Sequence, residues 1–145
     1  NESNMFVTLI VGILDLETGI LKLCNAGHNP PILIYPDGQV SYLEFKTQIF
    51  VGVVEDFKYS DEEVVLEKES KLFLYTDGVT EAENINKELY GEEKLLEMLS
   101  DNASSDVRTT VNVVVDSIAS HVKEAEASDD LTILLIQYEP GTANS

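Results

Sequence analysis

One stretch decides how this chain folds: Lys71-Leu72-Phe73-Leu74-Tyr75-Thr76-Asp77-Gly78-Val79-Thr80-Glu81-Ala82. It begins as a short apolar run of strand-forming residues, which predicts a buried strand. Asp77-Gly78 is a turn pair, and the residues from Val79 onward can start a helix with acids in its first turn. A carboxylate at the end of a buried strand is held rigidly, as metal and catalytic sites require. The alternative is that Asp77 is only a turn or helix-capping residue.

A second apolar run, residues 131–136, also predicts a buried strand, and Ser128-Asp129-Asp130 precedes it. The chain therefore has one aspartate that leaves a core strand and a pair that enters one. If these strands are neighbours, the three carboxylates converge on one edge of the sheet. Clustered carboxylates repel one another, and hard divalent cations bound through oxygen ligands usually compensate this repulsion.

The first half of the chain predicts antiparallel strands. Residues 5–14 are apolar at almost every position, which indicates a strand covered on both faces. Asp37-Gly38 supplies the turn of the clearest hairpin. Residues 59–66 predict a more exposed strand, which we expect to pair with residues 71–75. The expected strands are residues 5–14, 20–24, 32–35, 40–43, 59–66, 71–75 and 131–136.

Between Gly91 and Lys123 the apolar period changes from two to about 3.6, which predicts helices with a core-facing stripe. Ser104-Ser105-Asp106 is a plausible start for the second helix. Apolar stripes of this kind face a core far more often than they form binding grooves. The expected order is therefore strands, two helices and a last strand.

Composition limits the function. The 145 residues are 43% hydrophobic, enough for one folding unit with a sizeable core. Nine basic residues against 27 acidic ones give a net charge of −18, which argues against nucleic acid and against anionic membrane surfaces as partners. The single cysteine, Cys24, excludes an internal disulfide and fits a reducing compartment, so we expect a cytoplasmic location. No apolar run is long enough to span a bilayer.

Three motifs occur in a recognisable order: Asn25-Ala26-Gly27-His28-Asn29-Pro30-Pro31, then Tyr75-Thr76-Asp77-Gly78-Val79-Thr80-Glu81-Ala82, then Asp129-Asp130-Leu131-Thr132. With Met5-Phe6-Val7-Thr8-Leu9 near the start, they resemble the bacterial SpoIIE-type branch of the metal-dependent PPM (type 2C) serine/threonine phosphatases. The family's upstream Asp-x-Ser-Gly-His/Lys-Gly motif, whose aspartate bridges two metal ions, is absent from these 145 residues.

The resemblance implies an α+β fold: a layered sandwich of antiparallel β-sheets with helices on the outside. Because the upstream motif is absent, we expect the chain to lack the N-terminal elements of that fold. Residues 1–139 are then the C-terminal portion of a single phosphatase domain, and residues 140–145 a disordered tail. An uncovered sheet face would expose apolar surface and favour a homodimer.

The resemblance also assigns the site. Asp77 and Asp129 are implied to be direct ligands of one of two Mn²⁺ or Mg²⁺ ions, and Asp130 an indirect or additional ligand. Gly78 is implied to bring the backbone close to the site. His28 stands where other PPM phosphatases carry a metal-binding aspartate, so a ligand, a supporting group and a proton donor all remain open. Glu81 is either a supporting group or a solvated acid.

The implied activity is hydrolysis of phosphoserine or phosphothreonine on a small regulatory protein such as an anti-anti-sigma factor. We expect the parent protein to be an enzyme and these 145 residues alone to be inactive, with a metal site too weak to fill. The alternative is a non-catalytic signalling or interaction module that keeps the fold. With two histidines and one cysteine, the chain offers little for a zinc or thiolate mechanism.

Overall fold

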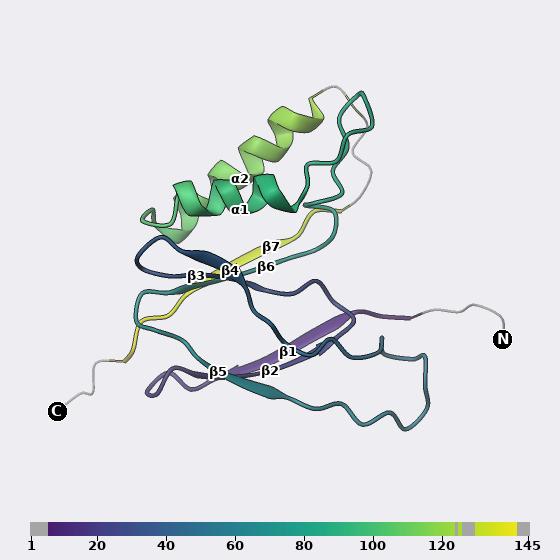
Figure 1. Cartoon of the computed structure of the whole chain (residues 1–145), viewed down its shortest axis with the longest axis vertical. Coiled ribbons are helices and arrows are strands. Elements are labelled where there is room, and N and C mark those ends of the chain that lie inside the picture. Colours follow the sequence, from purple (N-terminus) through teal and green to yellow (C-terminus); the bar gives the residue numbers. More distant parts are fainter. Residues whose placement is uncertain (1–5, 124, 126–129, 142–145) are drawn as a thin grey trace.

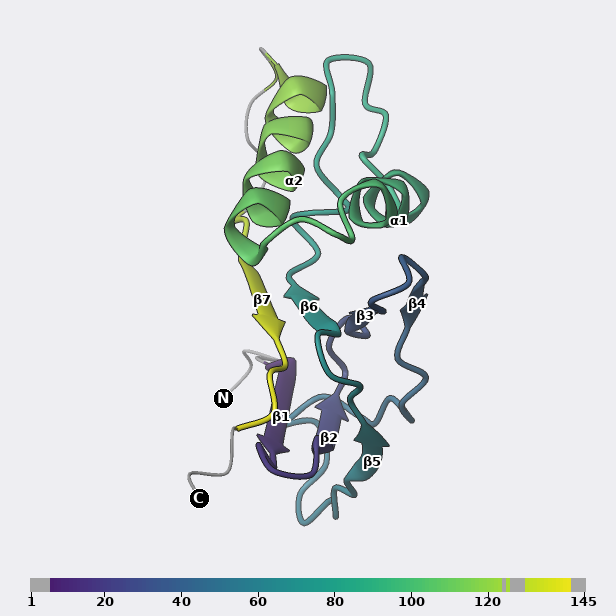
Figure 2. The ribbon, with the colours of Figure 1, turned by 90° about the vertical axis from the view of Figure 1, so that its left-hand side faces the viewer.

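The computed structural model describes residues 6–123, 125 and 130–141. Two helices, a four-stranded sheet and a three-stranded sheet lie on one another as three layers (Figures 1 and 2). The elements are β1 (Leu9–Leu14), β2 (Ile20–Ala26), β3 (Ile32–Ile34), β4 (Val40–Tyr42), β5 (Glu62–Val65), β6 (Lys71–Tyr75), α1 (Glu92–Asp101), α2 (Val107–Val122) and β7 (Ile133–Gln137).

The three-stranded sheet has the antiparallel order β1-β2-β5. A tight turn joins β1 to β2, because the Asp15 carboxylate accepts the backbone N–H groups of Glu17 (2.9 Å) and Thr18 (3.1 Å). Gly19 completes the turn with φ of 74°, and a side chain there would meet the Leu66 carbonyl at 2.6 Å. Glycine is thus required at this position by both conformation and space.

The four-stranded sheet has the antiparallel order β4-β3-β6-β7, so the decisive stretch supplies a central strand. The expected Asp37-Gly38 hairpin is present: the N–H of Tyr35 donates to Gln39, and Gly38 has φ of 91°. The expected pairing of residues 59–66 with 71–75 is wrong. β5 pairs with β2, because the chain crosses from one sheet to the other at residues 66–70.

Both helices pack on one face of the four-stranded sheet, as expected (Figure 2). Asp106 caps α2 by accepting the N–H of Thr109 at 3.0 Å. Lys71 at the start of β6 is buried, and its ammonium donates to the carbonyls of Ala103 (2.6 Å) and Ser105 in the loop between the helices. The buried core between the helices and the sheet comprises Ile32, Ile34, Phe73, Tyr75, Val79, Ala82, Tyr90, Leu95, Leu99, Val114 and Ile118.

A second core lies between the two sheets and comprises Leu21, Leu23, Leu33, Leu43, Leu66, Leu72 and Tyr138. The outer face of the three-stranded sheet has no described element packed on it. Val11 is 53% exposed, Ile13 71% and Val65 63%. The expectation that residues 5–14 form a strand covered on both faces is therefore wrong for the described part of the chain: β1 is an edge strand with one covered face.

Candidate metal centre and adjoining loops

The strands that flank the predicted ligands are neighbours. β6 and β7 pair in antiparallel register, with Tyr75 opposite Ile133. The pairing continues past the strand ends, because the Thr76 N–H donates to the Thr132 carbonyl (3.1 Å) and the Thr132 N–H donates to the Thr76 hydroxyl (3.0 Å). The segment that leaves β6 and the segment that enters β7 therefore lie together at one end of the sheet (Figure 1).

Asp77 begins a compact turn at that end. Its carbonyl accepts hydrogen bonds from the Glu81 N–H at 2.8 Å and from the Thr80 hydroxyl at 3.3 Å. Asp77 itself is exposed to solvent. The helix expected from Val79 onward does not form, and the next helix is α1. Gly78 is buried, but its φ is not positive, so the turn conformation alone does not demand glycine. Glu81 is exposed, and its role stays a prediction.

Asp130 reaches the same end from the other direction. It is exposed, and its carbonyl accepts the Thr76 hydroxyl at 3.4 Å. Asp129 lies outside the described residues. Within the described ranges, no group of three or more His, Cys, Asp or Glu side chains is arranged to hold a metal ion. Asp77 and Asp130 thus fit a divalent cation in ligand chemistry, because both offer hard oxygen donors, but they do not by themselves complete a coordination shell.

The His28 loop is held by Asn25, which begins the recognised motif but had no role assigned from the sequence. Asn25 is 1% exposed, donates its side-chain amide to the His28 carbonyl (2.9 Å) and accepts the His28 N–H (2.8 Å). The His28 Nδ1 lies 3.0 Å from the Thr8 hydroxyl. Gly27 has φ of 72°, and a Cβ there would lie 1.9 Å from the ring of Phe50. An amide residue at a strand end before Gly is the signal that could have identified this brace.

Tyr75, two residues before Asp77, is a buried phenol in the decisive strand. Burial raises the pKa of Tyr75 far above its usual range; the adjacent Tyr42 hydroxyl reinforces the shift, and the side chain of Asn29 opposes it. The Tyr42 hydroxyl is buried without a hydrogen-bond partner among the described residues. Burial also raises the pKa of Tyr42. Both phenols thus stay protonated at neutral pH.

Comparison with known proteins decides the family. The family described as Stage II sporulation protein E (SpoIIE) matches residues 1–139. The chain belongs to the SpoIIE family. Two curated proteins of similar sequence are Protein IcfG from Synechocystis sp. (29% identical, 91% of this chain, 20% of that protein) and phosphoserine phosphatase RsbP from Bacillus subtilis (28% identical, 95% and 32%). This chain therefore spans about a fifth to a third of the length of these SpoIIE-related proteins.

Solved structures confirm the fold expected for a SpoIIE family member. The RsbU and RsbW domains of a Mycobacterium tuberculosis protein superpose with a TM-score of 0.72 at 25% identity, over 93% of this chain and 37% of that one. The Mn-presoaked phosphatase domain of SpoIIE from Bacillus subtilis superposes with a TM-score of 0.71 at 16% identity, over 93% and 58%. The α+β arrangement of antiparallel sheets with outer helices is therefore confirmed. No described helix is long and apolar enough to cross a membrane.

Proposed function

We propose that this chain is the C-terminal portion, residues 1–139, of a metal-dependent protein serine/threonine phosphatase domain. One observation carries the proposal: β6 and β7 are neighbours, so the segments that hold Asp77 and Asp130 meet at one end of the sheet. The similarity to a protein named phosphoserine phosphatase supports the same activity class.

In this proposal Asp77, Asp129 and Asp130 hold Mn²⁺ or Mg²⁺. The bound cations supply activation of water and neutralise negative charge at the site. The chain's own residues supply position: the Thr76–Thr132 hydrogen bonds fix the two aspartate segments relative to each other. In the same proposal, Gly78 lets the backbone approach the site closely. His28, fixed by Asn25, is a supporting group near the site rather than a ligand.

The proposed substrate is phosphoserine or phosphothreonine on a small regulatory protein such as an anti-anti-sigma factor, in the cytoplasm. A net charge of −18 opposes approach of a phosphate dianion to the bare protein. Cations at the sheet edge would remove that barrier locally, whereas the rest of the surface would still repel nucleic acid.

These 145 residues alone are proposed to be inactive. They lack the Asp-x-Ser-Gly motif, and the described residues offer no three-ligand group. Without the second cation and its bridging carboxylate, the lost transition-state stabilisation amounts to several kcal/mol, or roughly a thousandfold in rate. In a longer protein that carries the upstream motif, we expect Asp77→Ala or Asp129→Ala to abolish turnover and His28→Ala to cost about tenfold to a hundredfold.

Calorimetric titration of this chain with Mn²⁺ tests the ligand assignment. We expect weak binding that Asp77→Asn weakens further, because the variant removes a charged oxygen donor while keeping the shape of the side chain. Asp101→Asn, at the exposed end of α1, is the matched control and leaves the binding unchanged. Equal Mn²⁺ affinity in the Asp77→Asn variant and in the unsubstituted chain would show that Asp77 is not a ligand.

A phosphatase assay on a phosphorylated partner protein, with and without chelator, tests the activity in the longer protein. Chelator-resistant turnover, or full turnover in Asp77→Ala, would leave the proposal without support. No turnover in the longer protein, with or without added Mn²⁺, would favour the second candidate, a non-catalytic interaction module, for which the absence of a three-ligand group among the described residues is the specific observation.

A further inference from the structure

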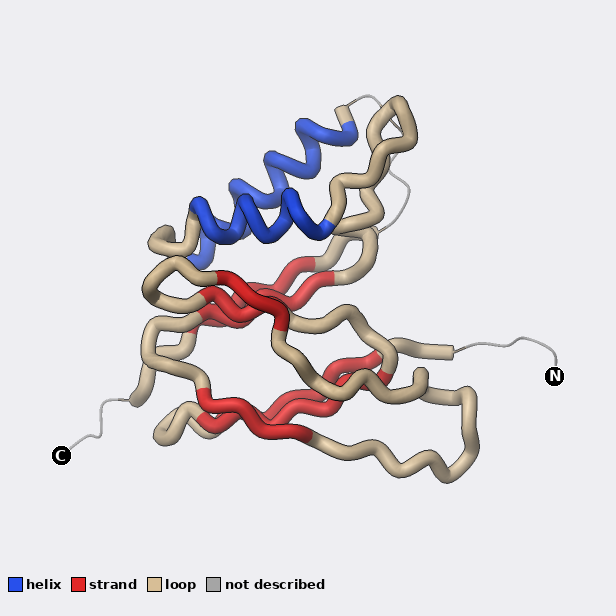
Figure 3. The backbone as a smooth tube through the Cα atoms, in the orientation of Figure 1, coloured by secondary structure: helices blue, strands red, loops and turns tan. Residues whose placement is uncertain are grey.

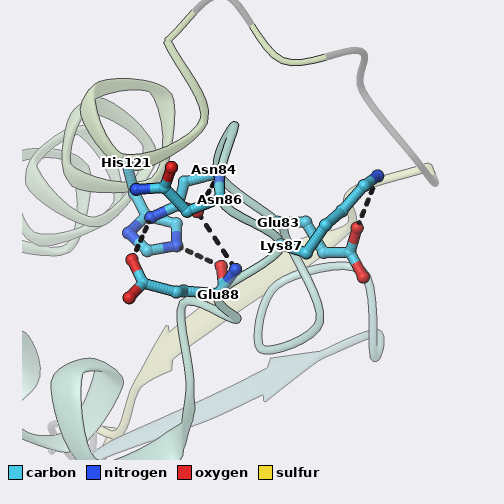
Figure 4. Close-up of polar contacts among 6 residues, drawn as sticks. All are labelled: Glu83, Asn84, Asn86, Lys87, Glu88 and His121. Carbon is cyan, nitrogen blue, oxygen red and sulfur yellow. Dashed lines mark hydrogen bonds and ion pairs between the residues drawn. The ribbon is translucent and has the colours of Figure 1, made fainter.

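A surface hollow of about 620 Å³ lies between the loop of residues 83–89, the C-terminal end of α2 and the first half of α1. Asn84, Ile85 and Asn86 line it from the loop, and Lys94 lines it from α1. Residues 120–123 close it from the end of α2. Figure 4 shows His121 turned toward the loop. None of these residues is assigned to the candidate metal centre.

The charge of the hollow is opposite to that of the rest of the chain. The chain has nine Lys and Arg residues against 27 acids, yet Lys94, His121 and Lys123 line the hollow, and among the residues that the structure describes no carboxylate residue lines it. The ion pairs among the described residues are Lys22–Glu63 and Lys87–Glu83, so neither Lys94 nor Lys123 is paired there. The Lys94 ammonium instead lies 5.0 Å from the centroid of the Tyr90 ring.

The loop of residues 83–89 is fixed by its own hydrogen bonds (Figure 4). The Asn84 side-chain oxygen accepts the N–H groups of Asn86 (2.9 Å) and Glu88 (3.0 Å), and its amide donates to the Glu88 carboxylate at 2.7 Å. Glu83 pairs with Leu89 across the loop. The wall of the hollow is therefore formed in advance, which reduces the conformational entropy that the loop itself loses when a ligand binds.

His121 connects this loop to α2. Its Nε2 lies 2.9 Å from the Glu88 carbonyl, and its ring meets Tyr90 edge-on with centroids 5.7 Å apart. Ile85, in the loop that lines the hollow, is 75% exposed, so the loop presents one large apolar side chain beside the cationic hollow. A fixed cationic hollow with one apolar neighbour is suited to a peptide segment rather than to a free ion.

The loop of residues 83–89 and the C-terminal end of α2, which line the hollow, lie on the same side of the molecule as the end of β6 and the start of β7 (Figure 1). The loop that forms it follows directly after the turn of Asp77 in the sequence. A protein whose phosphorylated residue reached the sheet edge would therefore have another part of its surface close to the hollow.

We propose that this hollow binds an acidic segment of the phosphoprotein substrate, with carboxylates near Lys94 and Lys123 and an apolar side chain against Ile85. The identity of the partner rests on the proposed function, but the charge complementarity does not. The competing explanation is that His121 and Lys123 only complement the negative end of the α2 dipole, in which case their loss changes stability and not binding.

The test uses two fluorescein-labelled peptides of equal length, one built from Glu, Asp and Leu and the other with Gln and Asn in place of the acids. Anisotropy titrations with this chain should show binding of the acidic peptide, weakened by salt, and little binding of the neutral one. The Lys94→Glu/Lys123→Glu pair should reduce affinity by roughly tenfold or more, and the Lys94→Gln/Lys123→Gln pair by less. Lys58→Glu/Lys68→Glu, at exposed positions outside the hollow, is the matched control.

Equal binding of the two peptides, or equal weakening by the hollow and control pairs, would overturn the proposal. Thermal melting identifies a variant that has lost its fold, and the Gln pair then replaces the Glu pair. In the longer protein, turnover of p-nitrophenyl phosphate should be unchanged by the hollow variants, because that substrate is too small to reach both places. If the unsubstituted longer protein shows no metal-dependent turnover, the proposed function is rejected while the peptide-binding result stands, so the two failures are distinguishable.

Discussion

The two sheets of this molecule are built from similarly apolar strands but are covered differently. The four-stranded sheet has helices on one face and the other sheet on its opposite face, and Phe73 in its central strand is 0% exposed. The three-stranded sheet is covered on one face only, within the described part of the chain (Figure 3). The alternation of side chains along β1 therefore separates a core face from an apolar face that meets solvent. An apolar strand sequence shows that the strand favours burial, but it does not show which element buries it.

The largest effect should come from truncating the closed core between the helices and the four-stranded sheet. Phe73→Ala removes a ring from a closed core and should cost about 3–5 kcal/mol in the free energy of unfolding. Val11→Ala, on the open face of the other sheet, should cost less than about 0.5 kcal/mol. Urea denaturation measures both. Equal losses would mean that Phe73 and Val11 are equally buried in solution.

A smaller effect should follow from Lys71→Met. The variant keeps most of the buried side-chain volume but leaves the carbonyls of Ala103 and Ser105 without their donor, which costs about 1–3 kcal/mol. Lys22→Met, which removes a half-exposed ion pair with Glu63 on the open sheet, is the control and should cost less. Burial lowers the pKa of Lys71. An unchanged midpoint in urea for Lys71→Met would show that the helix loop is held by other contacts.

Alkaline pH should lower the free energy of unfolding through the buried tyrosines that pack between the helices and the four-stranded sheet. Burial raises the pKa of Tyr75 above that of an unfolded tyrosine, so between the two values the unfolded chain loses a proton that the folded chain keeps. Stability is then fully present below about pH 10 and falls as pH rises further, by at most about 1.4 kcal/mol per pH unit for this group. Tyr75→Phe should flatten the slope. Because burial raises the pKa of Tyr42 and Tyr90 as well, some slope should remain. An identical slope in the variant would contradict the assignment.

The smallest effect on stability should come from Ile13→Lys with Val65→Lys on the open face. Both side chains are already exposed, so their replacement removes little buried area. Self-association should change instead: we propose that this face pairs two copies of the chain, and the charged variant should sediment as a monomer. If the unsubstituted 145-residue chain sediments as a monomer at all concentrations, the proposed homodimer is refuted.

Local chemistry made parts of the fold predictable. Asp37-Gly38 specified a hairpin and Asp106 a helix start, because both act through hydrogen bonds within a few residues. The pairing of β5 with β2 was not predictable in the same way. Strands that are adjacent in sequence usually pair, and no sequence signal within residues 66–70 indicates that the chain crosses there from one sheet to the other.

The candidate site was predictable in position but not in completeness. The apolar runs beside Asp77 and Asp130 indicated two core strands. That these two strands are neighbours depends on long-range pairing, which only the structure shows. Asn25 and Asn84 escaped notice because their partners are mainly backbone groups, whose positions depend on the folded loop. The ligand role of Asp77, Asp129 and Asp130 remains a prediction.

The pairing of β6 with β7 also sets the order in which the molecule can assemble. Tyr75 and Ile133 are partners although they lie far apart in the sequence, whereas β1 and β2 pair across a short turn. Contacts between distant residues form late, since a long loop must close before they bring any gain. While the chain is being synthesised, the hairpins of the first half can close early, but the edge of β6 stays unpaired until residues 133–137 arrive. The end of the sheet that carries Asp77 is therefore among the last parts of the molecule to form, and a newly made chain passes through an interval with an apolar strand edge open to other proteins.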